Sequence, residues 1–296
     1  MINFKDFFKD IRGAGYITSP SDEIVVQGWL LVTASPAQKV PALLALGPAG
    51  AGKTFFAECL SEALGLKLLF YQCHHGTGKE ELLYDLDVRG VVERLAGGVG
   101  SPSEYIKPGI LPQAIMSAQE GPTLLVLDEI DKTRPELDAF LLDFLQSGRI
   151  VDPHLGIYEL GGGKLYVFAT SNEERLLSEP LMRRFRRVYM KYPPEPVEVE
   201  IISRATGGPL ELIKGVVSVA RWLRSQEVIK PPATPELVNL VRDVLALRGI
   251  PDKVMASQLA ADVVVSWLAA YEEDKWILLS KYPIQWWVGY LRRFLG

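Results

Sequence analysis

The chain of 296 residues is long enough for one large domain or two ordinary ones, each with its own hydrophobic core. Its apolar fraction of 48% and its charged fraction of 23% are those of an ordinary globular protein. The formal net charge of −4 argues against non-specific binding of nucleic acid, although it does not exclude a local basic groove.

The N-terminus and the two cysteines bear on where the protein acts. Met1 to Arg12 alternates charged residues with phenylalanines, which predicts a short amphipathic helix rather than a signal peptide. No stretch approaches the roughly 18 to 20 apolar residues that a membrane-spanning helix needs. Cys59 and Cys73 form neither a metal-ligand pattern nor a disulfide framework, so we expect a reducing compartment and a cytoplasmic protein.

Short apolar runs alternate with helical patterns from Val40 to Tyr192. Each run is almost continuously apolar, which predicts strands that are covered on both faces. The predicted strands are 41–46, 67–71, 123–127 and 164–169, with 187–192 as a further candidate. Strands that alternate with helices are typical of a parallel α/β sheet.

A proline-rich segment separates this pattern from a second one. Tyr192-Pro193-Pro194-Glu195-Pro196 can continue neither a helix nor a central strand, so it predicts a linker. Helical spacing follows over 198–204, 210–225, 235–248 and 255–270. We therefore divide the chain into an α/β core with N-terminal helices, residues 1–192, and an all-helical domain, residues 193–296.

A phosphate-binding motif lies between the first strand and a helical stretch. Glycines in such a loop let backbone N–H groups surround an anion, and the helix N-terminus adds partial positive charge. The motif G-x-x-x-x-G-K-[ST] predicts a nucleotide site, with Lys53 on the β- and γ-phosphates and the Thr54 hydroxyl on Mg²⁺. A glycine-rich turn with a chance lysine is the alternative, which the order of strand, motif and helix disfavours. The predicted binding residues are Gly47, Pro48, Ala49, Gly50, Ala51, Gly52, Lys53, Thr54 and Phe55.

Two carboxylates end the third predicted strand. A carboxylate at the carboxyl end of a neighbouring parallel strand lies beside a phosphate loop. Asp128 is therefore predicted to hold Mg²⁺, and Glu129 to orient or deprotonate the attacking water. A solvated acidic turn is the alternative. Because the two carboxylates occur together with a phosphate loop, we favour the catalytic interpretation, with ATP and Mg²⁺ as cofactors.

These motifs, with two later ones, resemble those of AAA+ ATPases. Asp128-Glu129-Ile130-Asp131-Lys132 resembles their Walker B segment, and Ala169-Thr170-Ser171-Asn172 resembles their sensor 1 segment. Pro180-Leu181-Met182-Arg183-Arg184-Phe185 resembles the segment that carries the arginine finger. The resemblance implies a P-loop NTPase core followed by a helical lid domain, with Asn172 at the γ-phosphate or the water. It also implies that Arg184, or failing it Arg183, enters the site of a neighbouring subunit. A solvated basic face or a nucleic-acid patch is the alternative for this arginine cluster.

Within that superfamily the likeness is to the MoxR group and the related CbbQ, NorQ and GvpN proteins. Residues 105–111 are similar to their phenylalanine-rich segment, and residues 141–149 to one of their helices. The likeness implies an insertion over Leu86–Tyr105 and a hairpin over Val151–Lys164, facing a central pore or the substrate, with ordinary surface hairpins as the alternative. It places sensor 2 at Lys253, with Arg248 and Arg242 as competitors.

The function implied by the resemblance is that of a Mg-dependent ATPase that assembles into a ring. It would be a homo-oligomer, in the form of a hexamer, that remodels or assembles a client protein such as a metalloenzyme or a von Willebrand A-domain protein. A nucleic-acid motor or a GTPase of the McrB kind is the second class, and net charge argues against it. A nucleotide-gated scaffold is the third. The aromatic segment Trp276–Leu295 predicts packing of the last lid helices with an exposed aromatic edge, or else a helix that docks a partner or a membrane surface.

Overall fold

The computed structural model of the protein describes residues 9, 26–30, 39–86, 106–153 and 156–295. These residues fall into two compact units. The first takes in the chain up to Pro48 together with Gly52–Met190, and the second takes in Ala49–Ala51 together with the chain from Lys191 onwards. Each unit has a hydrophobic core of its own. No helix among the described residues is long and apolar enough to cross a membrane.

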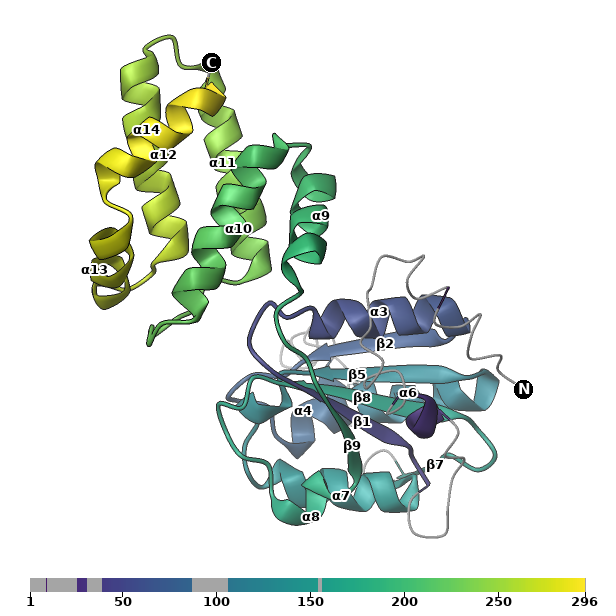
Figure 1. The fold of residues 1–296 in the computed structure, drawn as a ribbon. Helices are drawn as coiled ribbons and strands as arrows, with labels where there is room; N and C mark the ends of the chain where they lie inside the picture. The colour runs from purple at the N-terminus through teal and green to yellow at the C-terminus, as the bar shows by residue number, and fades with distance from the viewer. Residues whose placement is uncertain (1–8, 10–25, 31–38, 87–105, 154–155, 296) are drawn as a thin grey trace, which may run out of the picture. The chain divides into compact units, whose positions relative to one another are not determined.

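A five-stranded parallel sheet forms the centre of the first unit (Figure 1). In spatial order its strands are β2 (Lys67–Gln72), β5 (Thr123–Asp128), β8 (Leu165–Ser171), β1 (Ala42–Leu46) and β9 (Phe185–Tyr189). The strands predicted from the apolar runs are confirmed, and so is the parallel α/β fold. The fifth strand begins at Phe185 rather than at Arg187.

Helices cover both faces of this sheet (Figure 1). They are α3 (Lys53–Leu64), α4 (Lys79–Leu83), α6 (Ile110–Glu120), α7 (Leu137–Ser147) and α8 (Glu179–Met182). Since side chains alternate along a strand, Leu125 and Val167 face the core built with α4, α6, α7 and α8. Phe168 faces the other way and packs edge-on against Phe56 of α3, with 6.0 Å between ring centroids.

Strand β2 differs from the sequence-based expectation. It lies at the edge of the sheet, and its Leu68 and Phe70 side chains are 36% and 44% exposed. The prediction that this apolar run is covered on both faces is therefore wrong. An apolar run shows that a strand forms, but its place in the sheet depends on strands far away in the sequence.

Among the described residues, two short pairs of antiparallel strands accompany the sheet. Strand β3 (Tyr84–Leu86) pairs with β4 (Ile106–Pro108), and β6 (Arg149–Asp152) pairs with β7 (Gly156–Glu159). The second pair confirms the hairpin predicted over Val151–Lys164, although it starts two residues earlier, at Arg149. Residues 87–105 of the predicted insertion lie outside the described residues, as does nearly all of the predicted N-terminal helix.

The second unit is helical, as predicted. Its α-helices are α9 (Glu195–Thr206), α10 (Leu210–Arg224), α11 (Thr234–Ala246), α12 (Lys253–Leu268), α13 (Glu272–Lys281) and α14 (Ile284–Leu295). The predicted linker is shorter than expected, because α9 begins at Glu195 and takes Pro196 into its first turn. A proline is tolerated there because the first turn of a helix needs no N–H from that position.

A buried ion pair joins three of these helices. Glu198 of α9 is fully buried and accepts hydrogen bonds from Arg224 of α10 at 2.8 and 2.9 Å. The Thr234 hydroxyl of α11 donates to the same carboxylate at 2.7 Å. Because both carboxylate oxygens are satisfied, the charge can stay inside the core.

Candidate active site

The phosphate-binding motif forms the loop between β1 and α3. The strand ends at Leu46 and the helix begins at Lys53. Gly47 has a φ of 141°, and a Cβ there would lie 2.0 Å from the carbonyl oxygen of Met190. Gly52, directly before the helix, has a φ of 87°. A side chain at either position would be strained, so the loop depends on glycine.

The Lys53 ammonium group turns back onto the loop that precedes it. Its Nζ donates to the carbonyl oxygens of Gly47 (2.7 Å) and Pro48 (2.9 Å) and to Asn172 Oδ1 (2.8 Å). Lys53 is 6% exposed, and burial lowers its pKa, although nearby carboxylates, Asp128 first, act in the opposite direction. A buried cation held by neutral oxygens is suited to binding an anion at this loop.

Strand β5 ends in Asp128, whose carboxylate is held by two threonines. Thr54 Oγ1 in the first turn of α3 donates to Asp128 Oδ1 at 2.8 Å. Thr170 Oγ1, at the end of the neighbouring strand β8, donates to the same oxygen at 2.6 Å. The structure thus brings together Thr54 and Asp128, the two residues predicted as metal ligands. A hydroxyl and a carboxylate are hard oxygen donors of the kind that Mg²⁺ prefers.

Glu129 leaves the strand in a left-handed conformation, with φ 54° and ψ 49°. Its carboxylate accepts hydrogen bonds from Asn172 Nδ2 at 3.0 Å, Gln72 Nε2 at 2.7 Å and Lys132 Nζ at 2.8 Å. Burial would raise the pKa of Glu129, but the hydrogen bonds, with the charge of Lys132, hold it below its usual value. The carboxylate is therefore ionised at neutral pH, as a general base must be.

Asn172 connects the lysine and the glutamate of the site. Its side-chain oxygen accepts from Lys53 while its side-chain nitrogen donates to Glu129. Its own backbone N–H and that of Glu174 donate to Asp131 Oδ2 at 3.0 and 2.9 Å. Residues predicted from three separate motifs therefore lie in one hydrogen-bonded network, which we call the Lys53–Asn172–Glu129 network.

Several members of this site are not indicated by the sequence. Asp131, Lys132 and Thr170 lie inside the quoted motifs, but nothing in those motifs assigns a role to their side chains. Gln72 lies outside every motif. It is the polar residue that ends β2, and its backbone pairs in register with Asp128. Polarity at the carboxyl end of a strand could have indicated Gln72 only once the strand order was known.

The two candidate arginine fingers lie at the end of α8. Arg183 is exposed and forms an ion pair with Glu179, one helical turn earlier. Arg184 is half-buried, and its Nε donates to the side-chain oxygen of Gln146 in α7 at 3.1 Å once that amide is oriented to accept it. Their entry into a neighbouring subunit's site stays a prediction.

A largely buried ion pair holds the segment between Asn172 and these arginines. Arg175 donates to both oxygens of Asp138 in α7, at 2.9 and 3.1 Å, and to the Thr133 hydroxyl at 3.0 Å. The backbone N–H of Ser178 donates to the same carboxylate at 2.6 Å. The chain that leads from the end of β8 to α8 is therefore fixed against α7.

The three candidates for sensor 2 make contacts within the helical unit. Lys253 Nζ donates to the carbonyl oxygen of Leu295 at 2.9 Å. Arg248 donates to the carbonyl of Phe294 at 2.8 Å, and Arg242 to that of Ala205 at 3.1 Å. A role for any of them at the nucleotide stays a prediction, as does that of Phe55, which is 46% exposed on α3.

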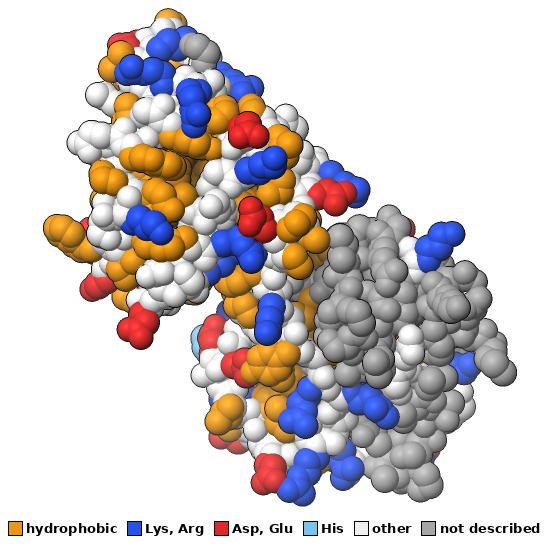
Figure 2. All heavy atoms as spheres, viewed as in Figure 1, with side chains coloured by type: hydrophobic (Ala, Val, Ile, Leu, Met, Phe, Trp, Pro, Cys, Tyr) orange, Lys and Arg blue, Asp and Glu red, His pale blue; other side chains and the backbone are white. Residues whose placement is uncertain are grey.

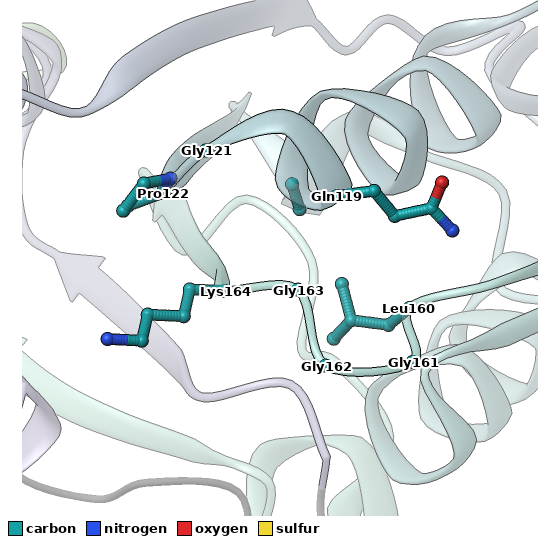
Figure 3. A pocket seen from close by; sticks show the side chains of 9 residues that line it. Gln119, Gly121, Pro122, Leu160, Gly161, Gly162, Gly163 and Lys164 are labelled. Carbon is teal, nitrogen blue, oxygen red and sulfur yellow. The ribbon is translucent and has the colours of Figure 1, made fainter.

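A shallow pocket of about 540 Å³ lies at the opposite end of the strands (Figure 3). It is lined by the end of α6, by Pro122 and by the loop Leu160–Lys164. These residues precede β5 and β8, whereas Asp128 and Asn172 follow them. The pocket is therefore separate from the Lys53–Asn172–Glu129 network.

The donor set of the site fits a nucleotide triphosphate with Mg²⁺. Gly47–Gly52 supply the backbone of a phosphate loop, and Lys53 supplies a buried cation. Thr54 and Asp128 supply oxygen ligands, with Glu129 ionised close by. No group of this set has chemistry that conflicts with a bound polyphosphate or with a hard divalent cation.

Similarities to known proteins agree with this geometry. Residues 42–185 match the family model of the AAA domain, dynein-related subfamily. The chaperone protein ClpB of Mycoplasmoides gallisepticum is 26% identical over 201 residues, which cover 66% of this chain and 26% of the chaperone. The negative regulator of genetic competence ClpC/MecB of Bacillus subtilis is 29% identical over 120 residues, 40% of this chain and 13% of that protein.

A further relative is a protease homolog rather than a chaperone. The peroxisomal Lon protease homolog 2 of Pichia angusta is 28% identical over 247 residues, 79% of this chain and 25% of that protein. The chain spans about a quarter or less of the length of these three relatives. The strand order and the phosphate loop agree with these similarities: residues 42–185 have the fold of an AAA+ core, and a helical lid domain follows them.

Proposed function

We propose that the protein binds ATP with Mg²⁺ and hydrolyses it to drive the remodelling or assembly of a partner protein. The observation that carries this proposal is the Lys53–Asn172–Glu129 network beside the Thr54–Asp128 pair. It brings a buried ammonium group, an ionised carboxylate and further hydroxyl and carboxylate oxygens together at the carboxyl ends of neighbouring parallel strands. These are the groups that hydrolysis of a phosphoanhydride requires.

Each residue has a role that follows from its chemistry. Lys53 would exchange the carbonyl oxygens of Gly47 and Pro48 for phosphate oxygens and neutralise their charge. Glu129 would orient the attacking water and accept its proton, while Asn172 keeps the carboxylate at a fixed distance from Lys53. Mg²⁺ bound at Thr54 and Asp128 would supply further neutralisation of the phosphate charge.

The second part of the proposal is a ring of identical subunits, a hexamer, in which Arg184 or Arg183 completes the site of the next subunit. The support is the ion pair of Arg175 with Asp138, because, with the Ser178 N–H on the same carboxylate, it holds the segment between Asn172 and the two arginines against α7. Through such a rigid connection, a structural change at the nucleotide site would move the arginines at the subunit boundary.

The third part concerns the client, which we propose to be a protein of the kind that MoxR-like ATPases act on, such as a von Willebrand A-domain protein or a metalloenzyme. The hairpin β6–β7 supports contact with a protein client. Val151 and Ile157 pair directly across this hairpin, and each is 61% exposed. Contiguous exposed apolar side chains mark surfaces that bind other proteins, and these two adjoin each other across the hairpin.

Hydrolysis tests the first part. Release of phosphate from ATP is measured for the native chain, for Glu129→Gln and for Glu58→Gln, an exposed glutamate on α3 that serves as the control. General-base catalysis contributes about 10² to 10⁴ in rate, so Glu129→Gln should lose at least about 100-fold while still binding ATP. Equal, slow hydrolysis by all three proteins would refute the proposal. GTP and added DNA are run in parallel, since faster turnover of GTP or stimulation by DNA would favour the second functional class.

Assembly tests the second part. Light scattering on Glu129→Gln with ATP and Mg²⁺ should show a discrete oligomer of about six subunits, because a ring with closed symmetry has a fixed number of subunits. Mixing Glu129→Gln with Arg184→Ala should restore part of the activity, because mixed rings contain sites with one intact residue from each subunit. A monomer under all conditions, or no recovery with either Arg184→Ala or Arg183→Ala, would rule out the arginine finger.

A further inference from the structure

The last helix of the lid domain, α14, and the turn that precedes it carry two stripes of side chains with different surroundings. Trp287, Leu291 and Leu295 recur every four residues, and all three are buried in the core of the helical unit. A second four-residue stripe lies beside the first and remains partly exposed, with Trp286 at 41%. The second stripe consists of Tyr282, Trp286, Tyr290 and Phe294. Tyr282, Tyr290 and Phe294 of the second stripe also pack against this core, whereas Trp286 is not among the residues that do so.

The second stripe forms a continuous row of rings with Trp222 of α10, which we call the aromatic ladder. Its successive ring centroids, from Trp222 through Tyr282, Trp286 and Tyr290 to Phe294, are 5.3, 5.0, 5.1 and 5.3 Å apart. Trp286 and Tyr290 are stacked with only 5° between their planes. Edge-on and stacked ring contacts of this kind are stabilising, so the rings hold one another in place.

The ladder is fixed to the helix beneath it. Tyr290 Oη donates to the carbonyl oxygen of Glu211 in α10 at 2.6 Å. Gly215 of α10 makes this contact possible, because a Cβ there would lie 1.8 Å from Tyr290 Oη. On the outer side, Gly289 is exposed with no atom within 4 Å of where its Cβ would be. The ladder is therefore a rigid surface with open space beside it, where another chain can approach.

Positive charge accompanies these rings. Lys281 Nζ lies 4.5 Å from the centre of the Trp222 ring, and the Arg293 guanidinium lies 4.7 Å from that of Tyr290. In the described part of the chain neither cation forms a salt bridge with a carboxylate. The sequence from Lys275 to Gly296 contains no Asp or Glu. Figure 2 shows hydrophobic side chains gathered on the helical unit where α14 crosses this face, with Lys and Arg side chains at the margin.

We propose that the aromatic ladder is a docking surface for an acidic segment of a partner protein, one in which Asp or Glu residues flank an aromatic or aliphatic anchor. Carboxylates of such a segment would pair with Lys281 and Arg293, which have no carboxylate partner among the described residues. Its anchor would contact Trp286, the most exposed ring of the ladder. Rigid aromatic and arginine side chains are the residues that contribute most to protein–protein binding.

The same contacts argue against nucleic acid or a membrane as the binding partner of the aromatic ladder. Bases bind by stacking on free ring faces, but Trp222 and Tyr290 are already covered by cations, and Trp286 and Tyr290 cover each other. Insertion into a membrane would need the apolar side of α14, which is buried in the lid core. The inference is independent of ATP hydrolysis, because no residue of the ladder belongs to the nucleotide site.

Selection from a display library of random 12-residue peptides on the full chain tests the proposal. The selected peptides should be rich in Asp and Glu around an aromatic or aliphatic residue. Their affinities are then measured by fluorescence anisotropy against the native chain and three variants. The double variant Lys281→Glu/Arg293→Glu should weaken binding about tenfold or more, because each ion pair becomes a repulsion. Trp286→Ala should weaken it through loss of the anchor contact.

Arg292→Glu is the matched control, since it changes the same charge on the same helix at a residue next to Arg293 and should retain most of the affinity. Circular dichroism and thermal unfolding establish that all variants are folded. The proposal is overturned if the selected peptides lack acidic residues, or if the double variant binds them as well as Arg292→Glu does. It is equally overturned if a 20-residue oligothymidylate or phosphatidylserine vesicles bind more tightly than the peptides and lose that binding in the double variant.

Discussion

The buried carboxylate of Asp131 accepts the backbone N–H of Asn172 at 3.0 Å, and with it holds the end of β8 in place. The same oxygen accepts the N–H of Glu174, while the second oxygen is buried without a hydrogen-bond partner among the described residues. Asp131 thereby positions the side chain that connects Lys53 and Glu129. It does so through backbone N–H groups.

Asp131→Asn should lower kcat for ATP hydrolysis about fivefold, because a hydrogen bond to a charged acceptor is worth about 1 kcal/mol more than one to a neutral acceptor. KM for ATP should change less, since Gly47–Thr54 are untouched. Steady-state kinetics measure both, and Asp143→Asn on the exposed side of α7 is the control. In a double-mutant cycle with Asn172→Ala the effects should not add, because both act on one network. An unchanged kcat, or fully additive effects, would contradict this role.

Lys132→Met should shift the acid limb of the pH–rate profile to higher pH. Lys132 helps to keep the pKa of Glu129 below its usual value, so its removal raises that pKa. A general base works only when ionised, and activity is therefore present above this pKa and lost as the pH falls through it. Measuring kcat from pH 4 to pH 8 gives the limb. Lys132→Arg, which keeps the charge, should leave the limb closer to that of the native chain; a limb that stays in place in Lys132→Met would contradict the assigned contact.

Asp128→Asn should raise the Mg²⁺ concentration needed for half-maximal ATPase activity. Even residues that only support a metal ligand change metal affinity by about 10- to 100-fold, so loss of a direct ligand should have at least this effect. The measurement is a Mg²⁺ titration at saturating ATP. Thr170→Ser is the matched control, because it keeps the hydroxyl that donates to Asp128. If both variants show the native Mg²⁺ dependence, Asp128 does not bind the metal.

Glu198→Ala should destabilise the helical domain by about 3–5 kcal/mol, because it leaves the Arg224 charge buried without its partner. Urea unfolding of the full chain, followed by fluorescence of the lid tryptophans, measures the change. Glu200→Ala removes the exposed pair with Arg204 and should cost no more than about 1 kcal/mol. Similar losses in the two variants would show that Glu198 is not held as described.

Neither cysteine should react with iodoacetamide at pH 8 in the folded protein. Burial, with the charges of Asp128 and its neighbours, raises the pKa of Cys73 to about 12, and burial raises that of Cys59 to about 11. The reactive thiolate is therefore scarce, and both thiols are buried. Mass spectrometry should show two alkylated cysteines only after unfolding. Rapid labelling of either residue in the native chain would contradict its placement.

Much of the fold could be predicted because its determinants are local in the sequence. The apolar runs that become β1, β5 and β8 are buried in the centre of the sheet, where every side chain needs to be apolar. The phosphate loop could be recognised for the same reason. Its glycines, lysine and threonine lie within eight residues of sequence. The left-handed φ of Gly52 favours glycine at that position whatever the rest of the fold is.

The partners of the catalytic groups were decided only by the tertiary structure. Gln72, Asp131 and Thr170 meet Glu129, Asn172 and Asp128 because β2, β5 and β8 are neighbours in the sheet, although long stretches of sequence separate them. The strand order also left β2 at an edge, with Leu68 and Phe70 exposed. A hydrogen bond requires two groups within about 3 Å, and only the folded arrangement of the strands sets that distance.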